Sequence, residues 1–325
     1  MHLSRRKTVL VLLSTLSAGV SPSMAQAPAT WPRKPISFVV PYPAGTPPDL
    51  LARYVAERLS KELGQPVPVE NKAGAGGAIG TAFVARSDPD GYTFLVTPSG
   101  TMTIAPAIQK LNYSADDFVP IAELGTISPV ATVRPDAPFA NYKEFVAAAK
   151  ARPGKYTFAT NGVGSATHLT GMILHKKAGI EVVDVPYKGA TDSMNDLIGG
   201  RVDIMYAPIT VPQIKADRLK GLAVVGDRRN PEIPQVSTLA EQGFDLSNVP
   251  GNWFGIFGPK GTPDVIVGSM AERIQRIMET PEARQRLQSL SIELDFKGPQ
   301  DFAKIVRADA AAMRRVIQSE GLQPK

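Results

Sequence analysis

Residues 35–63, PISFVVPYPAGTPPDLLARYVAERLSKEL, decide the expected fold because they join a strand pattern to a helix pattern through one short loop. The run begins with apolar residues typical of a buried strand, and 49–63 repeats apolar residues every four positions, as on one face of a helix. Gly64 then supplies a helix stop. Further strand patterns follow at 66–71 and 91–98. Strands that alternate with helices in this way predict a parallel sheet with right-handed crossovers.

A second series of alternating strand and helix patterns begins near residue 127 and ends with a strand at 251–259. Everything after residue 264 has helical periodicity. Two such series followed by a helical tail predict two α/β lobes, with the chain returning to the first lobe. The expected division is a signal segment at 1–25, the first lobe at 26–124, the second lobe at 125–253, and a return to the first lobe at 254–325.

The N-terminal residues have the order of a secretory signal. Basic residues at 5–7 precede an apolar run at 8–20 that is too short to cross a bilayer, and small residues suited to cleavage follow at 23–27. The chain contains no cysteine, which excludes disulfides, thiolate chemistry and a lipidated cysteine anchor. We therefore expect an exported, soluble and unanchored protein, and nothing in the sequence suggests more than a monomer.

The charge of the chain argues against a nucleic-acid partner. The formal net charge is +6, of which three positive charges belong to residues 1–25, leaving +3 on the expected mature chain. No cluster of Lys and Arg with interleaved aromatic residues is present.

The glycine-rich segment 71–80, NKAGAGGAIG, looks like a dinucleotide-binding loop, but it departs from that pattern. The third small residue of G-x-G-x-x-G would fall at Ile79, and the next strand ends without the acidic residue that binds ribose. Glycines also permit positive φ and a close approach of neighbouring backbone. The sequence favours this structural use over a nucleotide cofactor.

The loop 41–49, PYPAGTPPD, is the first candidate binding element because it joins a strand end to a helix start. Prolines suit the first helical turn, and free amides there attract an anion such as a carboxylate. We expect the amides of Ala44, Gly45 and Thr46 to point into a crevice. Asp49 either contacts the ligand or is simply a favourable acid in the first helical turn.

A matching loop, 160–168, joins a strand to a helix in the second series and is rich in hydroxyl groups and glycine. It either hydrogen-bonds a second ligand group, or Ser165 or Thr167 caps the helix without any ligand. Further strand ends lie at 99–101 and 186–189.

Catalytic patterns are absent from the sequence. Ser165 lies in no G-x-S-x-G elbow, and the two histidines of the expected mature chain, His168 and His175, do not have the spacing of an H-E-x-x-H metal site. An exported hydrolase using Ser165 and His168 stays a weaker alternative. The sequence predicts no catalytic centre, no metal site and no cofactor.

Several motifs together resemble the Bug family, the extracytoplasmic solute receptors of tripartite tricarboxylate transporters. They are KPISFVVPYPAGTPPDLLAR, VENKAGAGGAIGTAFVARSDPDGYTFLV, VPYKGATDSMNDLIGGRVDIM and WFGIFGPKGTP, in this order along almost the whole expected mature chain. The resemblance implies a type II periplasmic-binding-protein fold, with two α/β lobes joined by crossing strands near 128–135 and 253–259. It implies a receptor that is not an enzyme, binds a small carboxylate between the lobes and delivers it to membrane transporter subunits.

The resemblance also implies the residues that bind the carboxylate, through backbone amides and waters in the first lobe and through polar groups in the second. Glycines of 74–77 would form a wall beside this cleft. The predicted binding residues are Tyr42, Ala44, Gly45, Thr46, Asp49, Ser99, Thr101, Asn161, Gly164, Ser165, Thr167, His168, Tyr187 and Tyr206.

Three departures from the family pattern bear on the ligand. Thr46 stands where the family usually has a second glycine, Tyr42 replaces the usual phenylalanine, and Tyr206 occupies a segment that often holds Asp or Asn. These residues predict a larger or more aromatic pocket than one for aspartate or glutamate, so both aliphatic and aromatic carboxylates stay open. A sensor subunit that presents its ligand to a membrane signalling protein would share the same pocket.

Overall fold

The protein is described from a computed structural model that covers residues 31–162, 165–187, 189–226, 228–246, 249 and 251–319. The expected signal segment, and Gly164 among the predicted binding residues, lie outside the described residues. The described residues from Pro32 onwards form one compact unit.

The first sheet begins with the β-α-β pattern predicted from residues 35–98. Strand β1 pairs in parallel with β2 and β3, while β10 runs antiparallel between β3 and β4. The sheet is therefore mixed. Its strand order is β11-β4-β10-β3-β1-β2. The strands are β1 (Ser37–Val40), β2 (Val69–Asn71), β3 (Thr93–Pro98), β4 (Phe118–Thr126), β10 (Trp253–Pro259) and β11 (Glu293–Lys297).

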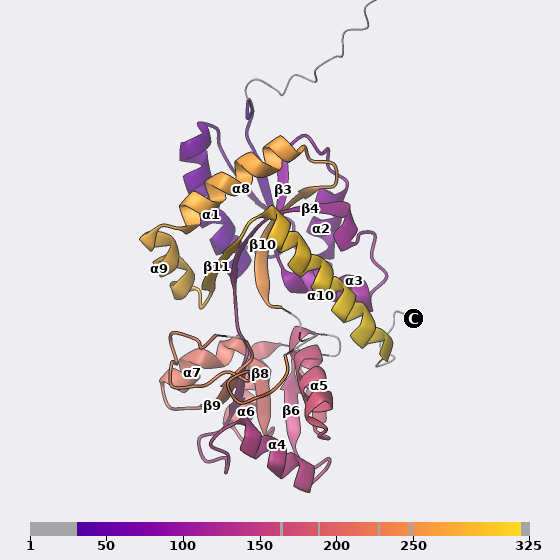
Figure 1. Ribbon diagram of the computed structural model, residues 1–325, viewed down its shortest axis with the longest axis vertical. Coiled ribbons are helices and arrows are strands. Elements are labelled where there is room, and N and C mark those ends of the chain that lie inside the picture. Colours follow the sequence, from indigo (N-terminus) through magenta and orange to yellow (C-terminus); the bar gives the residue numbers. More distant parts are fainter. Residues whose placement is uncertain are drawn as a thin grey trace, which may run out of the picture. The chain divides into compact units, whose positions relative to one another are not determined.

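Helices cover this sheet, and their apolar faces form its core (Figure 1). α1 packs on β1, β2 and β3 and also on α8, although these two helices are about 200 residues apart in sequence. The helices of this part are α1 (Pro47–Leu63), α2 (Ala78–Ala85), α3 (Ala105–Ile108), α8 (Asp264–Met278), α9 (Pro281–Ser289) and α10 (Pro299–Ser319).

The second sheet has the order β7-β6-β8-β5-β9 and carries its own apolar clusters. β6 pairs in parallel with β7 and β8, and β5 runs antiparallel to β8 and β9. The strands are β5 (Val130–Val133), β6 (Thr157–Thr160), β7 (Val183–Pro186), β8 (Ile204–Ala207) and β9 (Lys220–Val224). The helices are α4 (Tyr142–Ala151), α5 (Ala166–Ala178), α6 (Ala190–Ile198) and α7 (Val211–Lys215).

The chain passes between the sheets twice. It leaves the first sheet at Thr126 and enters the second at Val130, then returns between Val224 and Trp253. Where the passages meet, the Ile127 amide donates to the Asn252 carbonyl at 2.8 Å. This arrangement, two α/β sheets joined by crossing segments, is the predicted type II periplasmic-binding-protein architecture.

Helix α10 fixes the returning segment to the first sheet. The indole Nε1 of Trp253 donates to Asp309 Oδ2 at 2.7 Å, and the Trp253 and Phe302 rings meet edge to face at 5.0 Å. A Cβ on Gly255 would lie only 2.3 Å from the Phe302 ring. Glycine at this position therefore allows the helix to lie directly on β10.

Helix α10 also contacts α5, which belongs with the second sheet. Ala312, Met313 and Ile317 of α10 form one buried cluster with residues of α5 and with the end of the short π-helix η2 (Gly100–Ile104). The α5 members of this cluster are Leu169 and Ile173.

The expectation of a purely helical C-terminal tail is wrong, because β11 forms between α9 and α10. β11 is an edge strand of five residues, ELDFK, all of them only partly buried. So short a segment with charged residues gives little periodic signal, and its pairing with β4 comes from tertiary contact.

Glu123 on β4 is a buried acid next to the passage between the sheets. It is 2% exposed, and its Oε2 has no hydrogen-bond partner among the described residues. Burial, followed by the negative charge of Asp295, raises the pKa of Glu123 to about 8, against the opposing charge of Lys297. Asp309 adds to this rise, and Arg228 opposes it.

We expect Glu123 to make the folded state less stable as the pH rises. The folded protein keeps the Glu123 proton up to about pH 8, whereas the unfolded chain loses it near the ordinary carboxyl pKa. Unfolding free energy should therefore fall by at most about 1.4 kcal/mol per pH unit between these values. Glu123→Gln should remove this dependence. The melting temperature of the variant, relative to that of the wild type, should therefore be higher at pH 9 than at pH 5. An equal difference at both pH values would contradict the assignment.

Candidate functional site

The first candidate loop follows β1 and leads into α1. Thr46 is the N-cap of α1 with an extended backbone, and prolines occupy the first helical positions. Its hydroxyl donates to the Pro43 carbonyl at 2.7 Å. Gly45 has φ +82° and open space around the position of a Cβ, so only backbone conformation requires glycine here.

Asp49 holds this loop from inside the helix start. Its side chain is 1% exposed and accepts hydrogen bonds from the Gly45 amide at 2.8 Å, from Arg53 Nε at 3.0 Å and from Asn71 Nδ2 at 2.8 Å. Burial alone would raise the pKa of Asp49, but the hydrogen bonds from Arg53, Gly45 and Asn71 outweigh it and hold the pKa below its ordinary value. Asp49 is therefore an anion that structures the loop.

The loop amides differ from the prediction. The Gly45 amide is not free, because it donates to Asp49, and the Thr46 amide lies 3.4 Å from the Pro43 carbonyl. Within the described residues, the Ala44 amide has no hydrogen-bond partner. The negative side chain of Asp49 thus takes the place at the helix N-terminus that was expected for a ligand carboxylate.

Tyr42 joins the first loop to the glycine-rich segment and to η2. Its hydroxyl lies 2.6 Å from Thr101 Oγ1 and 3.4 Å from the Gly76 carbonyl. A Cβ on Gly77 would lie 3.2 Å from the Thr101 side chain and 3.4 Å from the Tyr42 ring. The predicted structural role of the GAGG glycines agrees with this close approach. Ser99 lies at the start of η2 and, like Thr101, is buried.

The second candidate loop joins β6 to α5, and its polar groups mostly bond one another. Ser165 caps α5 by accepting from the His168 amide at 3.2 Å, and its hydroxyl lies 3.0 Å from Thr167 Oγ1. Thr167 also accepts from the Asn161 amide at 2.9 Å. The side-chain oxygen of Asn161 accepts from Ser193 at 3.3 Å. Ser165 therefore caps α5, as the second of the two predicted alternatives for this loop stated.

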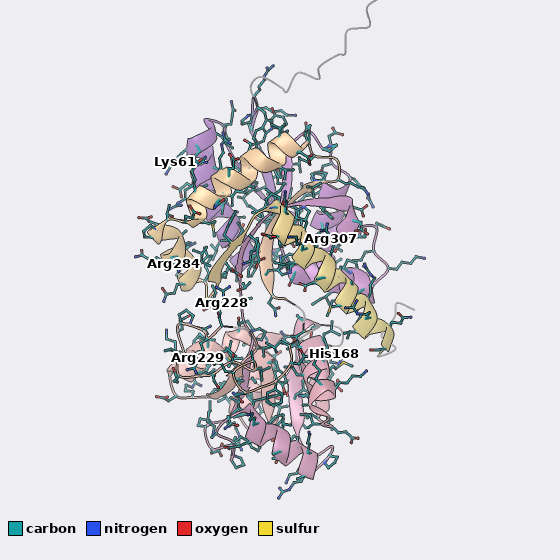
Figure 2. The ribbon with its side chains drawn as sticks, in the orientation of Figure 1. Lys61, His168, Arg228, Arg229, Arg284 and Arg307 are labelled. Atoms are coloured by element: carbon teal, nitrogen blue, oxygen red, sulfur yellow. The ribbon has the colours of Figure 1, made fainter. Side chains whose placement is uncertain are left out.

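His168 is a packed residue at the start of α5 (Figure 2). It is 5% exposed, its ring stacks on Phe158, and Nε2 lies 3.9 Å from Asp184. Burial lowers the pKa of His168, against the opposing effect of Asp184. The hydrogen bonds of the Ser165 hydroxyl go to Thr167 and to the His168 backbone, an arrangement that gives no support to a Ser–His hydrolase pair.

Two predicted tyrosines belong to the second sheet and its connections. Tyr187 borders the loop between β6 and α5, and Tyr206 does not. Tyr187 is half-buried, and its hydroxyl donates to Asp196 at 2.7 Å. Tyr206 is fully buried, with its hydroxyl 2.7 Å from His175 Nε2 and 3.1 Å from the Tyr142 hydroxyl. A ligand contact by the Tyr206 side chain does not fit this geometry, because strand β8 turns the ring into the core.

Arg53 and Asn71 complete the shell around Asp49, although neither was among the predicted binding residues. Arg53 Nη2 also donates to Asn71 Oδ1 at 3.0 Å, and Asn71 Nδ2 reaches the Tyr42 carbonyl at 3.0 Å. Two signals could have found them. Arg53 follows Asp49 by one helical turn, and Asn71 ends the strand that pairs in parallel with β1.

The described part of the chain contains no group of three or more His, Asp or Glu side chains placed to hold a metal ion. None of the helices in the described ranges is both long and apolar enough to cross a membrane.

Comparisons with known proteins identify relatives of this arrangement. The sequence model described as tripartite tricarboxylate transporter family receptor, TctC, matches residues 51–322. The protein BugT of Bordetella pertussis is 33% identical over 288 residues, covering 86% of each chain. A TctC solute binding protein from Polaromonas, solved without ligand, is 31% identical with a TM-score of 0.81, covering 89% of this chain and all of the other.

Two similar structures were solved with a small molecule. Rpa4515 of R. palustris, solved with adipate, is 28% identical with a TM-score of 0.73 and covers 91% of this chain and all of its own. MatC of Rhodopseudomonas palustris, solved with bound malate, is 29% identical with a TM-score of 0.69 and covers 88% of this chain and all of its own.

We expect removal of the Asp49 carboxylate to destabilise the protein. Asp49→Ala leaves the Gly45 amide and the Asn71 and Arg53 side chains without their shared acceptor, which should cost roughly 1–3 kcal/mol. Glu57→Ala is the matched control on the same helix, because Glu57 pairs with Lys61 at the surface and should change the denaturation midpoint little. Urea denaturation would compare the variants, and equal midpoints for both would contradict the structural role of Asp49.

Proposed function

The chain belongs to the tripartite tricarboxylate transporter family of receptors, and from this membership we propose that it captures a small carboxylate in the periplasm and delivers it to membrane transporter subunits. The observation that carries the proposal is the pair of strand-to-helix loops, one after β1 and one after β6. In α/β sheets, ligands bind beyond the carboxyl ends of parallel strands. The family function is solute binding, so the proposal is capture without turnover.

The proposal places the ligand between two lobes, 26–124 with 254–325 and 125–253, in a monomer. Each lobe supplies one loop. A ligand that contacts both loops favours the closed arrangement of the lobes by its additional contacts in that state. The predicted signal segment would direct export.

The contacts around Asp49 restrict how a carboxylate is held. A ligand carboxylate that replaced Asp49 at the Gly45 amide would take one hydrogen bond from that buried anion, which would keep only Arg53 and Asn71 as partners. We therefore propose that the ligand is held through the Ala44 amide, through bridging waters, and through the hydroxyl groups and amides of the second loop. Gly164 belongs to this proposed set.

The ligand class follows from the relatives. Rpa4515 was solved with adipate and MatC with malate, and we extend this chemistry to the present chain as aliphatic dicarboxylates. Tyr42 and Thr46 keep aromatic carboxylates within the proposed range. Tyr206 no longer supports an enlarged pocket, because its side chain belongs to the core.

Thermal unfolding of residues 26–325 with a panel of carboxylates tests the proposal. The panel should contain adipate, malate, succinate and benzoate, with the corresponding amides as controls. A ligand at 100 times its dissociation constant adds about 2.7 kcal/mol, which raises the melting temperature by several degrees. The proposal would be contradicted if none of the carboxylates raised the melting temperature of a folded, ligand-free preparation.

The position of Gly45 gives a second prediction. Gly45→Val forces a β-branched residue to φ +82°, so we expect the loop to change conformation and carboxylate affinity to fall at least tenfold while the protein stays folded. Gly154→Val is the matched control, since Gly154 also has positive φ with open space but lies in the turn after α4. Calorimetric titration with the best ligand of the panel would measure both. Unchanged affinity in Gly45→Val would remove the first loop from the site.

A further inference from the structure

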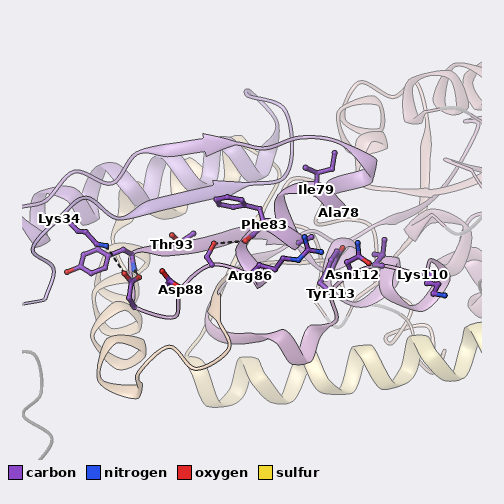
Figure 3. A pocket seen from close by; sticks show the side chains of 15 residues that line it. Lys34, Ala78, Ile79, Phe83, Arg86, Asp88, Thr93, Lys110, Asn112 and Tyr113 are labelled. Atoms are coloured by element: carbon purple, nitrogen blue, oxygen red, sulfur yellow. Dashed lines mark hydrogen bonds and ion pairs between the residues drawn. The ribbon is translucent and has the colours of Figure 1, made fainter.

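A groove of about 850 Å³ lies on the side of the first sheet that carries α2, apart from the two candidate loops (Figure 3). One wall is α2, and the others are the turn before β3 and the segment 110–113. Neither the proposed ligand site nor the core accounts for this surface. Its principal lining residues are Lys34, Ile79, Phe83, Arg86, Lys110 and Tyr113.

The α2 wall exposes large apolar side chains. Ile79 and Phe83 lie one helical turn apart and are 57% and 47% exposed. The opposite face of α2 is buried through residues such as Val84. Ile79 and Phe83 therefore lie on the face of the helix that points away from the core. The Ile79 side chain covers Gly74, where a Cβ would lie 2.5 Å from Cδ1. The apolar patch is thus held in place by the GAGG segment.

Cationic side chains surround this patch. Lys72 Nζ lies 4.4 Å from the centre of the Phe83 ring and pairs with Glu70 Oε2 at 3.2 Å. Arg86 and Lys110 are exposed, and within the described residues neither has an ion pair. Figure 3 shows Arg86 directed towards Asn112 and Tyr113, with Lys110 beyond them. This end of the groove therefore offers two cations beside an exposed isoleucine.

The acids of the groove lie at its other end. Asp90 pairs with Lys34 at 3.2 Å, and Lys34 also lies 4.3 Å above the Tyr92 ring. Asp88 is drawn on the Lys34 side of the groove, away from Lys110 (Figure 3). The separation of charge leaves the Arg86–Lys110 end positive.

The groove is connected to the first candidate loop by hydrogen bonds. Tyr113 lines the groove, and its hydroxyl donates to the Thr101 carbonyl at 2.9 Å. The Thr101 hydroxyl in turn lies 2.6 Å from that of Tyr42. A partner seated in the groove would thus touch a side chain bonded to the segment that positions the loop.

We propose that this groove docks an acidic segment of the membrane protein that receives the ligand, with an apolar side chain between Ile79 and Phe83 and carboxylates at Arg86 and Lys110. This inference rests on the proposed function for the identity of the partner. Charge complementarity specifies the acidic character, because such pairing steers and orients association. A second copy of this chain fits poorly, since a symmetric contact would bring the same cations together.

A peptide-binding measurement tests the chemistry of the groove without reference to any transported ligand. The probe is a fluorescein-labelled dodecapeptide with a central leucine flanked by aspartates, and its counterpart has lysines in place of the aspartates. Fluorescence anisotropy should show at least tenfold tighter binding of the acidic peptide. The double substitution Arg86→Glu and Lys110→Glu should reverse this preference, and Phe83→Ser should weaken binding at least threefold.

Matched controls separate the groove from general surface attraction. Lys155→Glu changes an exposed lysine elsewhere, and Val265→Ser removes another large exposed apolar residue, 56% exposed on α8. Both control variants should bind the acidic peptide as the wild type does. Equal weakening in groove and control variants, or no preference for the acidic peptide, would overturn the proposal.

Uptake measurements connect the groove to delivery. In cells that express the chain with its membrane subunits, the Arg86/Lys110 double variant should reduce uptake of the labelled panel ligand at least tenfold. The purified variant should keep its affinity for that ligand, because neither residue belongs to the proposed binding loops. Wild-type uptake by this variant, or loss of ligand affinity, would contradict a docking role. If the wild-type protein binds no carboxylate, the proposed function fails, whereas the peptide measurement still decides the groove.

Discussion

The buried carboxylate of Asp49 is the interaction on which the first candidate loop depends. It lies at the N-terminus of α1, where the helix dipole favours a negative charge, and it accepts hydrogen bonds from the loop amide of Gly45, from Arg53 and from Asn71. Those donors come from the loop, the helix and the neighbouring strand β2. One anion therefore joins three chain segments, and it also accepts from the Gly45 amide that was expected to bind a ligand carboxylate. On the proposed function, the ligand must use the remaining polar groups and water.

Strong local patterns allowed much of the fold to be predicted. The run from β1 into α1, with its prolines and the closing Gly64, carries its signals within 30 residues, and Ser165 was among the expected caps of α5. β11 was not predicted, because its five partly buried residues have no distinctive period and form a strand only by pairing with β4. The two alternating series of strand and helix patterns predicted two α/β lobes, and the family resemblance added the crossing strands that join them, since periodicity alone does not determine which strands of separate series share a sheet.

The site was harder to predict than the fold because hydrogen-bond partners come from distant positions. The amide of Gly45 was expected to be free, since the sequence does not show that Asp49 turns back to accept from it. Tyr206 was expected in the pocket, but its strand directs the ring into the core against His175. Residue type indicated polar loops correctly. The direction of each side chain depends on which face of a strand or helix is buried.

The glycine-rich segment 71–80 shows how one sequence signal can serve two surfaces. Gly77 allows Thr101 and Tyr42 to approach, which supports the loop beside the proposed ligand, while Gly74 leaves room for Ile79 to lie over the segment and face the groove. The same short stretch of chain thus separates the binding loop from the proposed docking groove. A partner that displaced Ile79 would disturb its contact with Gly74, which lies two residues before the Gly76 carbonyl that accepts from Tyr42. If the groove docks the membrane partner and the loop binds the ligand, both lie against the same glycine-rich segment. No hinge would then separate the proposed docking surface from the proposed ligand loop.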